Sequence, residues 1–219
     1  MSATYDAVVF DNDGVLTTLT DREVLLEAIT DAFREVGVAE PPAEQVRTLL
    51  GPDVDSVRRI ARDHGVDAEA LWEARERAAV TAQFEELVAG RKRPYEDIAI
   101  LEELEVPTGV VSNNQHETIA NVLEQCDLAE FDVWYGREPS LEGIARKKPE
   151  PYYLERAIDD LGATNPLYVG DSPVDVIAAD AAGVDAAFVR RDHRLESEPP
   201  TDPEPTYEID SLEEIRPLV

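Results

Sequence analysis

The sequence predicts an α/β fold: a Rossmann-like parallel sheet with helices on both faces, plus an all-helical domain inserted after the first strand. Short apolar runs alternate with stretches whose apolar residues recur at helical spacing, which is typical of a parallel sheet. Between residues 17 and 90 this alternation stops, and only helical stretches follow one another. Several apolar runs also end directly in acidic or polar turns, where α/β sheets bind their ligands.

Five apolar runs are predicted as buried strands, because continuous apolar runs are typical of strands covered on both faces. They are residues 5–10, 106–111, 131–135, 166–169 and 184–189. Three helices are predicted between or after these runs, at residues 115–127, 151–161 and 173–182.

The inserted segment has apolar residues at helical spacing in three stretches, at 21–37, 54–64 and about 67–89. Gly51-Pro52 interrupts it, and Asp53 is the expected cap of the next helix. We therefore predict a helical cap domain at residues 17–89. The α/β core domain is predicted at residues 1–16 and 90–219.

The charge of the chain is its strongest bulk signal. The 219 residues include 48 acids against 20 bases, for a net charge of −28. Such a surface repels nucleic acid and anionic membranes, so neither is expected as a partner. This excess of acidic over basic residues resembles that of cytosolic proteins of salt-accumulating halophiles, in which molar salt screens the repulsion between acids.

Other bulk features indicate a cytoplasmic protein. No run approaches the roughly 18 apolar residues of a membrane span, and the first ten residues lack the basic and apolar regions of a secretory signal. Cys126 is the sole cysteine, which excludes an internal disulfide and fits a reducing compartment. We expect a monomer or a homodimer.

Groups suited to a phosphate and a metal follow three of the predicted strands. Asp11 and Asp13 follow the first, Ser112 and Asn113 the second, and Asp171 and Asp175 the fourth, while Lys148 precedes the fourth. Because the carboxyl ends of parallel strands share one edge of the sheet, these side chains are expected to meet there.

This set suits phosphate chemistry. Clustered carboxylates repel one another unless a hard cation joins them, and Mg²⁺ prefers oxygen ligands and substrate phosphates. Asp11 could attack phosphorus to form an aspartyl-phosphate, and Asp13 could give a proton to the leaving oxygen and later take one from water. Lys148 and Ser112 would hold the phosphoryl oxygens, and Gly14 permits the sharp turn after the site.

Each motif alone has a simpler interpretation as a turn or a helix cap. Asp-x-Asp-Gly also begins calcium loops, but the twelfth loop position counted from Asp11 is Arg22, whereas such a loop needs an acid there. The order of the four motifs, and the position of three of them directly after predicted strands, favours a catalytic site.

With these motifs the chain resembles the haloacid dehalogenase-like hydrolase superfamily, in the subgroup with a helical cap. The matching segments are 11–16, 111–113, 148–149 and 170–175. The resemblance implies Asp11 as nucleophile and metal ligand. It implies Asp13 as acid/base that binds Mg²⁺ through its backbone carbonyl, Asp171 as the third ligand and Asp175 as a supporting acid. For phosphate binding we predict Ser112, Asn113 and Lys148.

The resemblance further implies a phosphatase acting on a small phosphorylated metabolite, of the phosphoglycolate or sugar-phosphate type. Asp13 favours this over a dehalogenase, which lacks the second aspartate. The alternatives are a phosphosugar mutase similar to β-phosphoglucomutase and, from another class, a non-catalytic protein that binds a phosphorylated ligand.

Substrate specificity is expected to come from the cap. Arg47, Arg58 and Arg59 lie near the helix break and would suit a second anionic group, although they could equally pair with surrounding acids. His116 follows the second motif and could face the site, but it is expected on the surface at a helix start. Three further bases, Arg190, Arg191 and His193, could line the site entrance or balance the acidic tail. Trp72 and Phe84 are predicted in the cap core.

Overall fold

The computed structural model describes residues 5–128, 131–194 and 199–219. Its centre is a six-stranded parallel sheet in the order β3-β2-β1-β4-β5-β6. The strands are β1 (Ala7–Phe10), β2 (Thr108–Gln115), β3 (Val133–Arg137), β4 (Pro166–Gly170), β5 (Asp185–Val189) and β6 (Tyr207–Ile209). All five predicted strands are present. The short edge strand β6 was not predicted, because it follows a proline- and acid-rich stretch. Residues 195–198 of that stretch lie outside the described residues.

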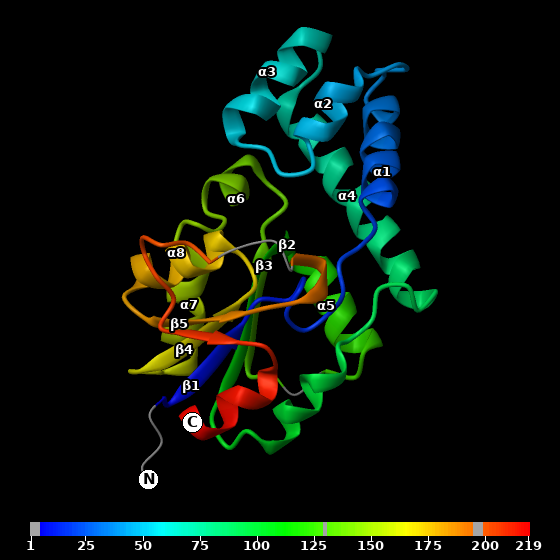
Figure 1. The fold of residues 1–219 in the computed structure, drawn as a ribbon. Coiled ribbons are helices and arrows are strands. Elements are labelled where there is room, and N and C mark those ends of the chain that lie inside the picture. Colours follow the sequence, from blue (N-terminus) through cyan, green and yellow to red (C-terminus); the bar gives the residue numbers. More distant parts are fainter. Residues whose placement is uncertain (1–4, 129–130, 195–198) are drawn as a thin grey trace.

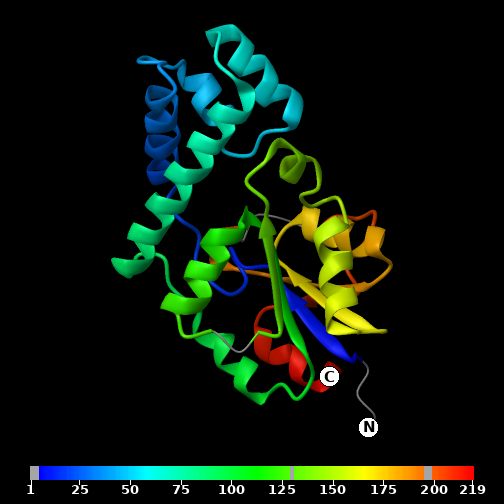
Figure 2. The same ribbon diagram turned by 180° about the vertical axis from the view of Figure 1, so that it is seen from behind.

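Helices cover both faces of the sheet, as Figures 1 and 2 show. Those of the core are α5 (His116–Gln125), α6 (Leu141–Ala145), α7 (Tyr152–Leu161) and α8 (Pro173–Ala182), with 3₁₀ helices at Glu96–Glu103, Asp192–Arg194 and Leu212–Leu218. The three predicted core helices are confirmed within two residues at either end. The sequence did not reveal α6, which has only five residues, or the 3₁₀ helices.

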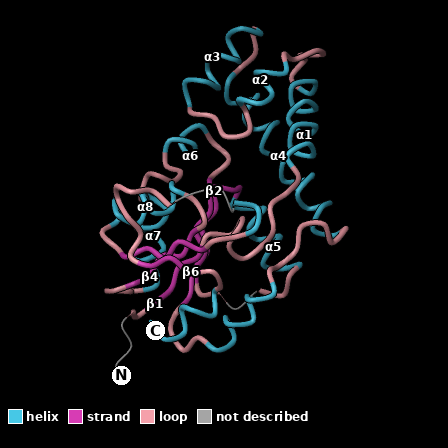
Figure 3. Tube along the Cα trace, in the orientation of Figure 1, coloured by secondary structure: helices cyan, strands magenta, loops and turns pink. Residues whose placement is uncertain are grey.

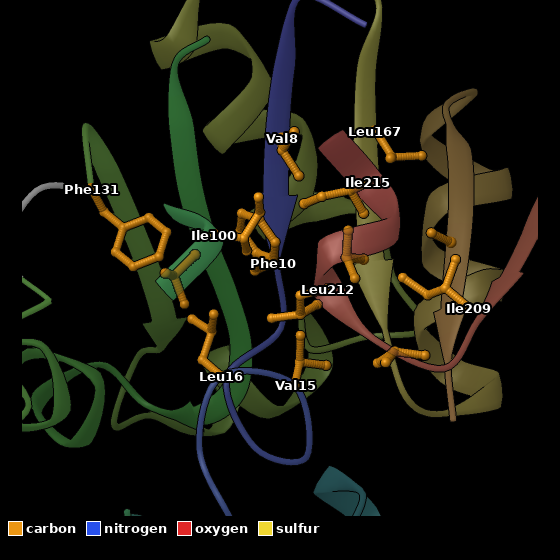
Figure 4. Packing of buried hydrophobic residues seen from close by; sticks show 14 of the residues in the cluster. Val8, Phe10, Val15, Leu16, Ile100, Phe131, Leu167, Ile209, Leu212 and Ile215 are labelled. Atoms are coloured by element: carbon orange, nitrogen blue, oxygen red, sulfur yellow. The ribbon is translucent and has the colours of Figure 1, made fainter. Parts of the chain in front are cut away.

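Two hydrophobic clusters hold the sheet between these layers. Because side chains alternate along a strand, Val8 and Phe10 of β1 pack into one cluster and Val9 into the other. Figure 4 shows the first cluster, in which Phe10 lies among Ile100 and Leu212. Burial of each such side chain contributes about 1.5–3 kcal/mol, so the sheet is anchored on both faces.

The insert between β1 and β2 consists of α1 (Arg22–Glu35), α2 (Ala43–Thr48), α3 (Val54–His64) and α4 (Ala68–Val88). Asp53 caps α3 as expected, accepting a hydrogen bond from the backbone N–H of Ser56 at 2.6 Å. Trp72 is buried in the cluster that joins these helices. The prediction for Phe84 was wrong: it is 38% exposed, on the solvent side of α4.

The cap helices lie beyond the carboxyl ends of the strands. In Figure 3 most of the cap, drawn in cyan, lies above the magenta strands of the sheet. Leu141 and Ile144 of α6 belong to the same hydrophobic cluster as Trp72, so a core segment packs directly against the cap. The domain boundaries at 16/17 and 89/90 remain predictions. Within the described residues, no helix is both long and apolar enough to span a bilayer.

Candidate active site

The candidate site lies where the strand order reverses, between β1 and β4, which is the usual ligand position in open α/β sheets. Asp11 follows β1 and its backbone N–H donates to the carbonyl of Val169 in β4 at 2.8 Å. Ser112 lies near the end of β2, and Asp171 follows β4. A cavity of about 380 Å³ opens here. Its lining includes all the predicted core residues: Asp11, Asp13, Ser112, Asn113, Lys148, Asp171 and Asp175.

Three buried carboxylates form one cluster. One oxygen each of Asp11, Asp171 and Asp175 lies within 4.8 Å of the others. Burial, together with the neighbouring acids and against the opposing effect of Lys148, raises the pKa of Asp11 to about 7. The cluster is therefore short of positive charge, and its hard oxygen donors fit a divalent cation such as Mg²⁺.

Lys148 lies at the centre of this cluster. Its Nζ is 3.0 Å from Asp11 Oδ1 and 2.7 Å from Asp175 Oδ1, and it donates to the hydroxyl of Tyr168 at 2.7 Å. Asn113 holds the backbone of Lys148 on both sides: its amide accepts from the N–H at 2.8 Å and donates to the C=O at 2.9 Å. In this structure Asn113 therefore positions Lys148.

Asp175 is already committed to hydrogen bonds. It accepts from Lys148, from the Tyr168 hydroxyl at 3.2 Å, and from both the backbone N–H and the hydroxyl of Ser172 in a capping box. A Cβ on Gly170 would come within 2.2 Å of the Asp175 Cβ, so the strand end must be glycine. Asp175 thus orients Lys148, as a supporting acid would.

Asp13 lines the same cavity but makes its hydrogen bonds with residues outside the carboxylate cluster. Its carboxylate contacts Lys92 Nζ and accepts from Asn114 Nδ2 at 2.9 Å. Burial alone would raise the pKa of Asp13, but Lys92 and the hydrogen bonds from Lys92 and Asn114 outweigh it and lower the pKa below its usual range. Lys92 also donates to the Thr18 carbonyl at 3.0 Å. Neither Lys92 nor Asn114 was singled out from the sequence.

His193 reaches the site from the segment after β5. Its Nε2 is 2.8 Å from Asp171 Oδ2, and its Nδ1 is 3.2 Å from the Tyr95 hydroxyl. Gly14 has φ of 86°, and a Cβ there would lie 2.3 Å from Asp171 Oδ2. Glycine at this turn is thus needed for conformation and for space.

The two arginines beside His193 have acidic partners. Arg190 pairs with Glu208 at 2.6 Å, and Arg191 pairs with Asp97 at 2.8 Å. His193 contacts the carboxylate cluster through Asp171.

A second, cationic part of the cavity lining comes from α4, from the end of β3 and from the segment before Lys148. Arg75 and Arg137 are both buried and both pair with Glu76, at 2.7 Å each. Their guanidinium groups lie 5.1 and 4.7 Å from the centre of the Trp72 ring. Lys147 completes this part of the lining. None of these bases was singled out from the sequence.

The cap arginines named from the sequence lie elsewhere. Arg47, Arg58 and Arg59 are exposed and do not line the cavity. The Arg58 side chain is 58% exposed and lies 4.0 Å from Asp55. His116 is exposed at the start of α5, as expected.

The fold and the carboxylate cluster together define an α/β protein with a helical cap and a candidate metal-binding site. A sequence profile described as haloacid dehalogenase-like hydrolase matches residues 8–189, and the chain belongs to this family. A phosphoglycolate phosphatase of Neisseria gonorrhoeae is 34% identical over 189 residues, covering 81% of this chain and 76% of that protein. The predicted family and enzyme class, a phosphatase of this family, are thereby confirmed.

Solved structures agree on the fold. CbbY from Rhodobacter sphaeroides in complex with phosphate has a TM-score of 0.71 at 20% identity and covers 96% of both chains. A CbbY mutant in complex with xylulose-1,5-bisphosphate has a TM-score of 0.68 at 18% identity and covers 94% of both chains. These likenesses confirm the α/β core with its helical insert.

Proposed function

We propose that the protein is a magnesium-dependent phosphatase that hydrolyses a small phosphate monoester through an aspartyl-phosphate on Asp11. One observation carries this proposal. A buried carboxylate lies at the switch point of the sheet, 3.0 Å from the ammonium of Lys148, and a second carboxylate, that of Asp13, lies two residues further on and lines the same cavity. Acid, base and anion-binding groups therefore surround one reacting position.

The reaction has two halves. In the first, an Asp11 oxygen bonds to phosphorus while the bond from phosphorus to the leaving oxygen breaks, and Asp13 gives that oxygen a proton. In the second, Asp13 takes a proton from water, the water oxygen bonds to phosphorus, and Asp11 is released with inorganic phosphate. Lys148 and Ser112 hold the phosphoryl oxygens throughout.

The Lys92 contact bears on the state of Asp13. A lowered pKa keeps Asp13 ionised at neutral pH, which suits the second half, in which it acts as a base. For the first half it must hold a proton. A phosphate dianion bound beside Asp13 would favour that protonated form, because like charges disfavour ionisation.

Mg²⁺ would be held by the carboxylates of Asp11 and Asp171 and by the backbone carbonyl of Asp13. Asp175 is the third acid of the cluster, but its existing hydrogen bonds favour the supporting role. The ion supplies positive charge that neutralises the acids and the phosphoryl group.

For the substrate, the name of the Neisseria relative supports 2-phosphoglycolate, and the xylulose-1,5-bisphosphate bound by CbbY keeps sugar phosphates as a second class. A cytoplasmic location, adaptation to high salt, and a monomeric or dimeric state remain predictions from the sequence.

A panel of phosphate monoesters, assayed with Mg²⁺ at low and molar salt, tests the proposal. We expect one inorganic phosphate released for each ester consumed, loss of turnover in EDTA and recovery with Mg²⁺. Formation of a phosphorylated isomer without free phosphate would identify a mutase. No turnover of any ester under these conditions would contradict the proposal.

A further inference from the structure

One part of the cavity lining carries more positive charge than its neighbours balance. We call the side chains of Arg75, Arg137 and Lys147 the cationic wall. Arg75 and Arg137 are 5% and 4% exposed, and Glu76, at 2%, is the buried carboxylate that both contact. Three positive charges against this one negative charge leave a net charge of about +2 beside the cavity, in a chain of net charge −28.

Lys147 is the least balanced member of the cationic wall. Its Nζ donates to the carbonyl of Pro52 at 2.6 Å. Among the described residues no carboxylate lies within ion-pair distance, and Asp53 and Glu76 act on it only from further away. Burial, followed by Arg137 and Arg75, lowers its pKa to about 8. Lys147 is half-buried, and removing a charge from water to this extent is costly unless an anion pairs with it.

Each side chain of the cationic wall also has N–H groups that donate no hydrogen bond to the described residues. Arg137 donates to both oxygens of Glu76 and, at 3.2 Å, to the carbonyl of Asn113, which uses three of its five N–H groups. Arg75 donates to Glu76 and to the carbonyls of Leu49 and Leu50, again three of five. Lys147 uses one of its three. Because all three line the cavity, a ligand can reach this region.

The cationic wall lies next to Lys148 and Asn113, the residues proposed to bind the phosphate. Lys147 precedes Lys148, and consecutive Cα atoms lie about 3.8 Å apart. Arg137 is bonded to Asn113, which in turn holds the backbone of Lys148. The cavity, about 380 Å³, is near the lower end of the range for small-molecule sites. One compact molecule can therefore contact both ends.

We propose that Lys147, Arg137 and Arg75 bind a second anionic group of the substrate, either a carboxylate or a second phosphate. This inference rests on the proposed phosphatase function and narrows it. The substrate class is a short phosphate monoester with a second anion a few bonds from the ester oxygen. The wall selects this class because a neutral substituent would leave its charges without a partner.

The test compares two substrates of nearly equal size. Ethyl phosphate and 2-phosphoglycolate differ by a methyl in place of a carboxylate. Lys147→Met removes the charge and keeps most of the side-chain volume. We expect kcat/KM for 2-phosphoglycolate to fall by roughly 10- to 100-fold, as for the loss of a charged hydrogen bond, and that for ethyl phosphate to change less than about threefold.

Arg146→Gln is the matched control. It also removes one positive charge, at the preceding position, but Arg146 pairs with the surface acids Glu138 and Glu142, packs over the Tyr152 ring and does not line the cavity. We expect both substrates to be hydrolysed as by the wild type. Ethane-1,2-diol bisphosphate is the third substrate. The substrate whose kcat/KM falls more in Lys147→Met, 2-phosphoglycolate or the bisphosphate, identifies the second anion as carboxylate or phosphate.

Binding to Asp11→Asn, measured by calorimetry with Mg²⁺, gives a readout without turnover. We expect this variant to prefer 2-phosphoglycolate over ethyl phosphate at least tenfold, and the double variant with Lys147→Met to lose that preference. Equal losses for both substrates would show a structural role and overturn the inference, as would no loss for either. If wild type hydrolyses no phosphate ester, the proposed function itself fails.

Discussion

Glu76→Gln is the substitution whose effect on stability the structure defines most clearly. Glu76 of α4 pairs with Arg75 of the same helix and with Arg137 at the end of β3, so it joins cap to core. The side chains of all three are at most 5% exposed. Glutamine keeps the shape and some hydrogen bonding but leaves two buried guanidinium groups without a countercharge.

The magnitude follows from the cost of breaking a buried ion pair, about 3–5 kcal/mol. In a chain of this size, 1 kcal/mol shifts Tm by about 2–4 °C, so we expect Tm to fall by about 6–20 °C. Thermal unfolding followed by circular dichroism at one fixed salt concentration measures this. Molar salt should rescue little of the loss, because ions screen buried charges poorly.

Glu73→Gln provides the control on the same helix. Glu73 is 60% exposed and lies 3.9 Å from Arg77. Exposed pairs contribute about 0–1 kcal/mol, so its Tm should stay within about 4 °C of wild type. If Glu76→Gln unfolds at the same temperature as Glu73→Gln, the buried pair does not hold cap and core together, and the reasoning is refuted.

Three further predictions concern Asp13, Lys147 and the surface charge. Asp13→Asn should keep turnover of p-nitrophenyl phosphate within about tenfold of wild type. It should lower turnover of alkyl phosphates by about 10²–10⁴, the usual contribution of general acid–base catalysis. Steady-state rates on both substrates measure this, and equal losses would contradict the acid role of Asp13. Lys147 has a lowered pKa of about 8, so it is charged below that pH and neutral above it. The KM for 2-phosphoglycolate should therefore rise as pH increases through 8 while that for ethyl phosphate does not, and parallel pH profiles would count against the cationic wall. Finally, with a net charge of −28, Tm should rise between 0.1 M and 1 M salt as the screening length falls from about 10 to 3 Å; an unchanged Tm would argue against halophilic adaptation.

The sequence predicted those parts of the site that depend on local order along the chain. Asp11 and Asp171 each lie just after a buried strand and Ser112 lies in the second half of one, and parallel strands bring their carboxyl ends to one edge. Lys148 could be placed with them because it belongs to a short motif ahead of a helix. Alternating apolar runs and helical spacing were enough to define the sheet and the helical insert.

The remainder depends on contacts that no local pattern encodes. Lys92 meets Asp13 across 79 residues, and Arg137 meets Glu76 across 61. The composition contains one signal of the site that needs no local pattern: Lys92, Lys147 and Lys148 are the only lysines of the chain, and all three lie at the site.

The cap arginines show a related limit of sequence reasoning. Arg58 and Arg59 were chosen for their closeness to the helix break at Gly51-Pro52. Their orientation, however, follows the helical phase of α3, in which Val57 and Ile60 face the core and the arginines face solvent.

Labelling of Asp11 during turnover tests the central claim most directly. Wild-type protein is mixed with Mg²⁺ and 2-phosphoglycolate carrying radiolabelled phosphate, quenched in acid within milliseconds and digested. The label should appear on the peptide that contains Asp11, and Asp11→Asn should show neither label nor turnover. Label on another peptide, or turnover by Asp11→Asn within tenfold of wild type, would contradict the account.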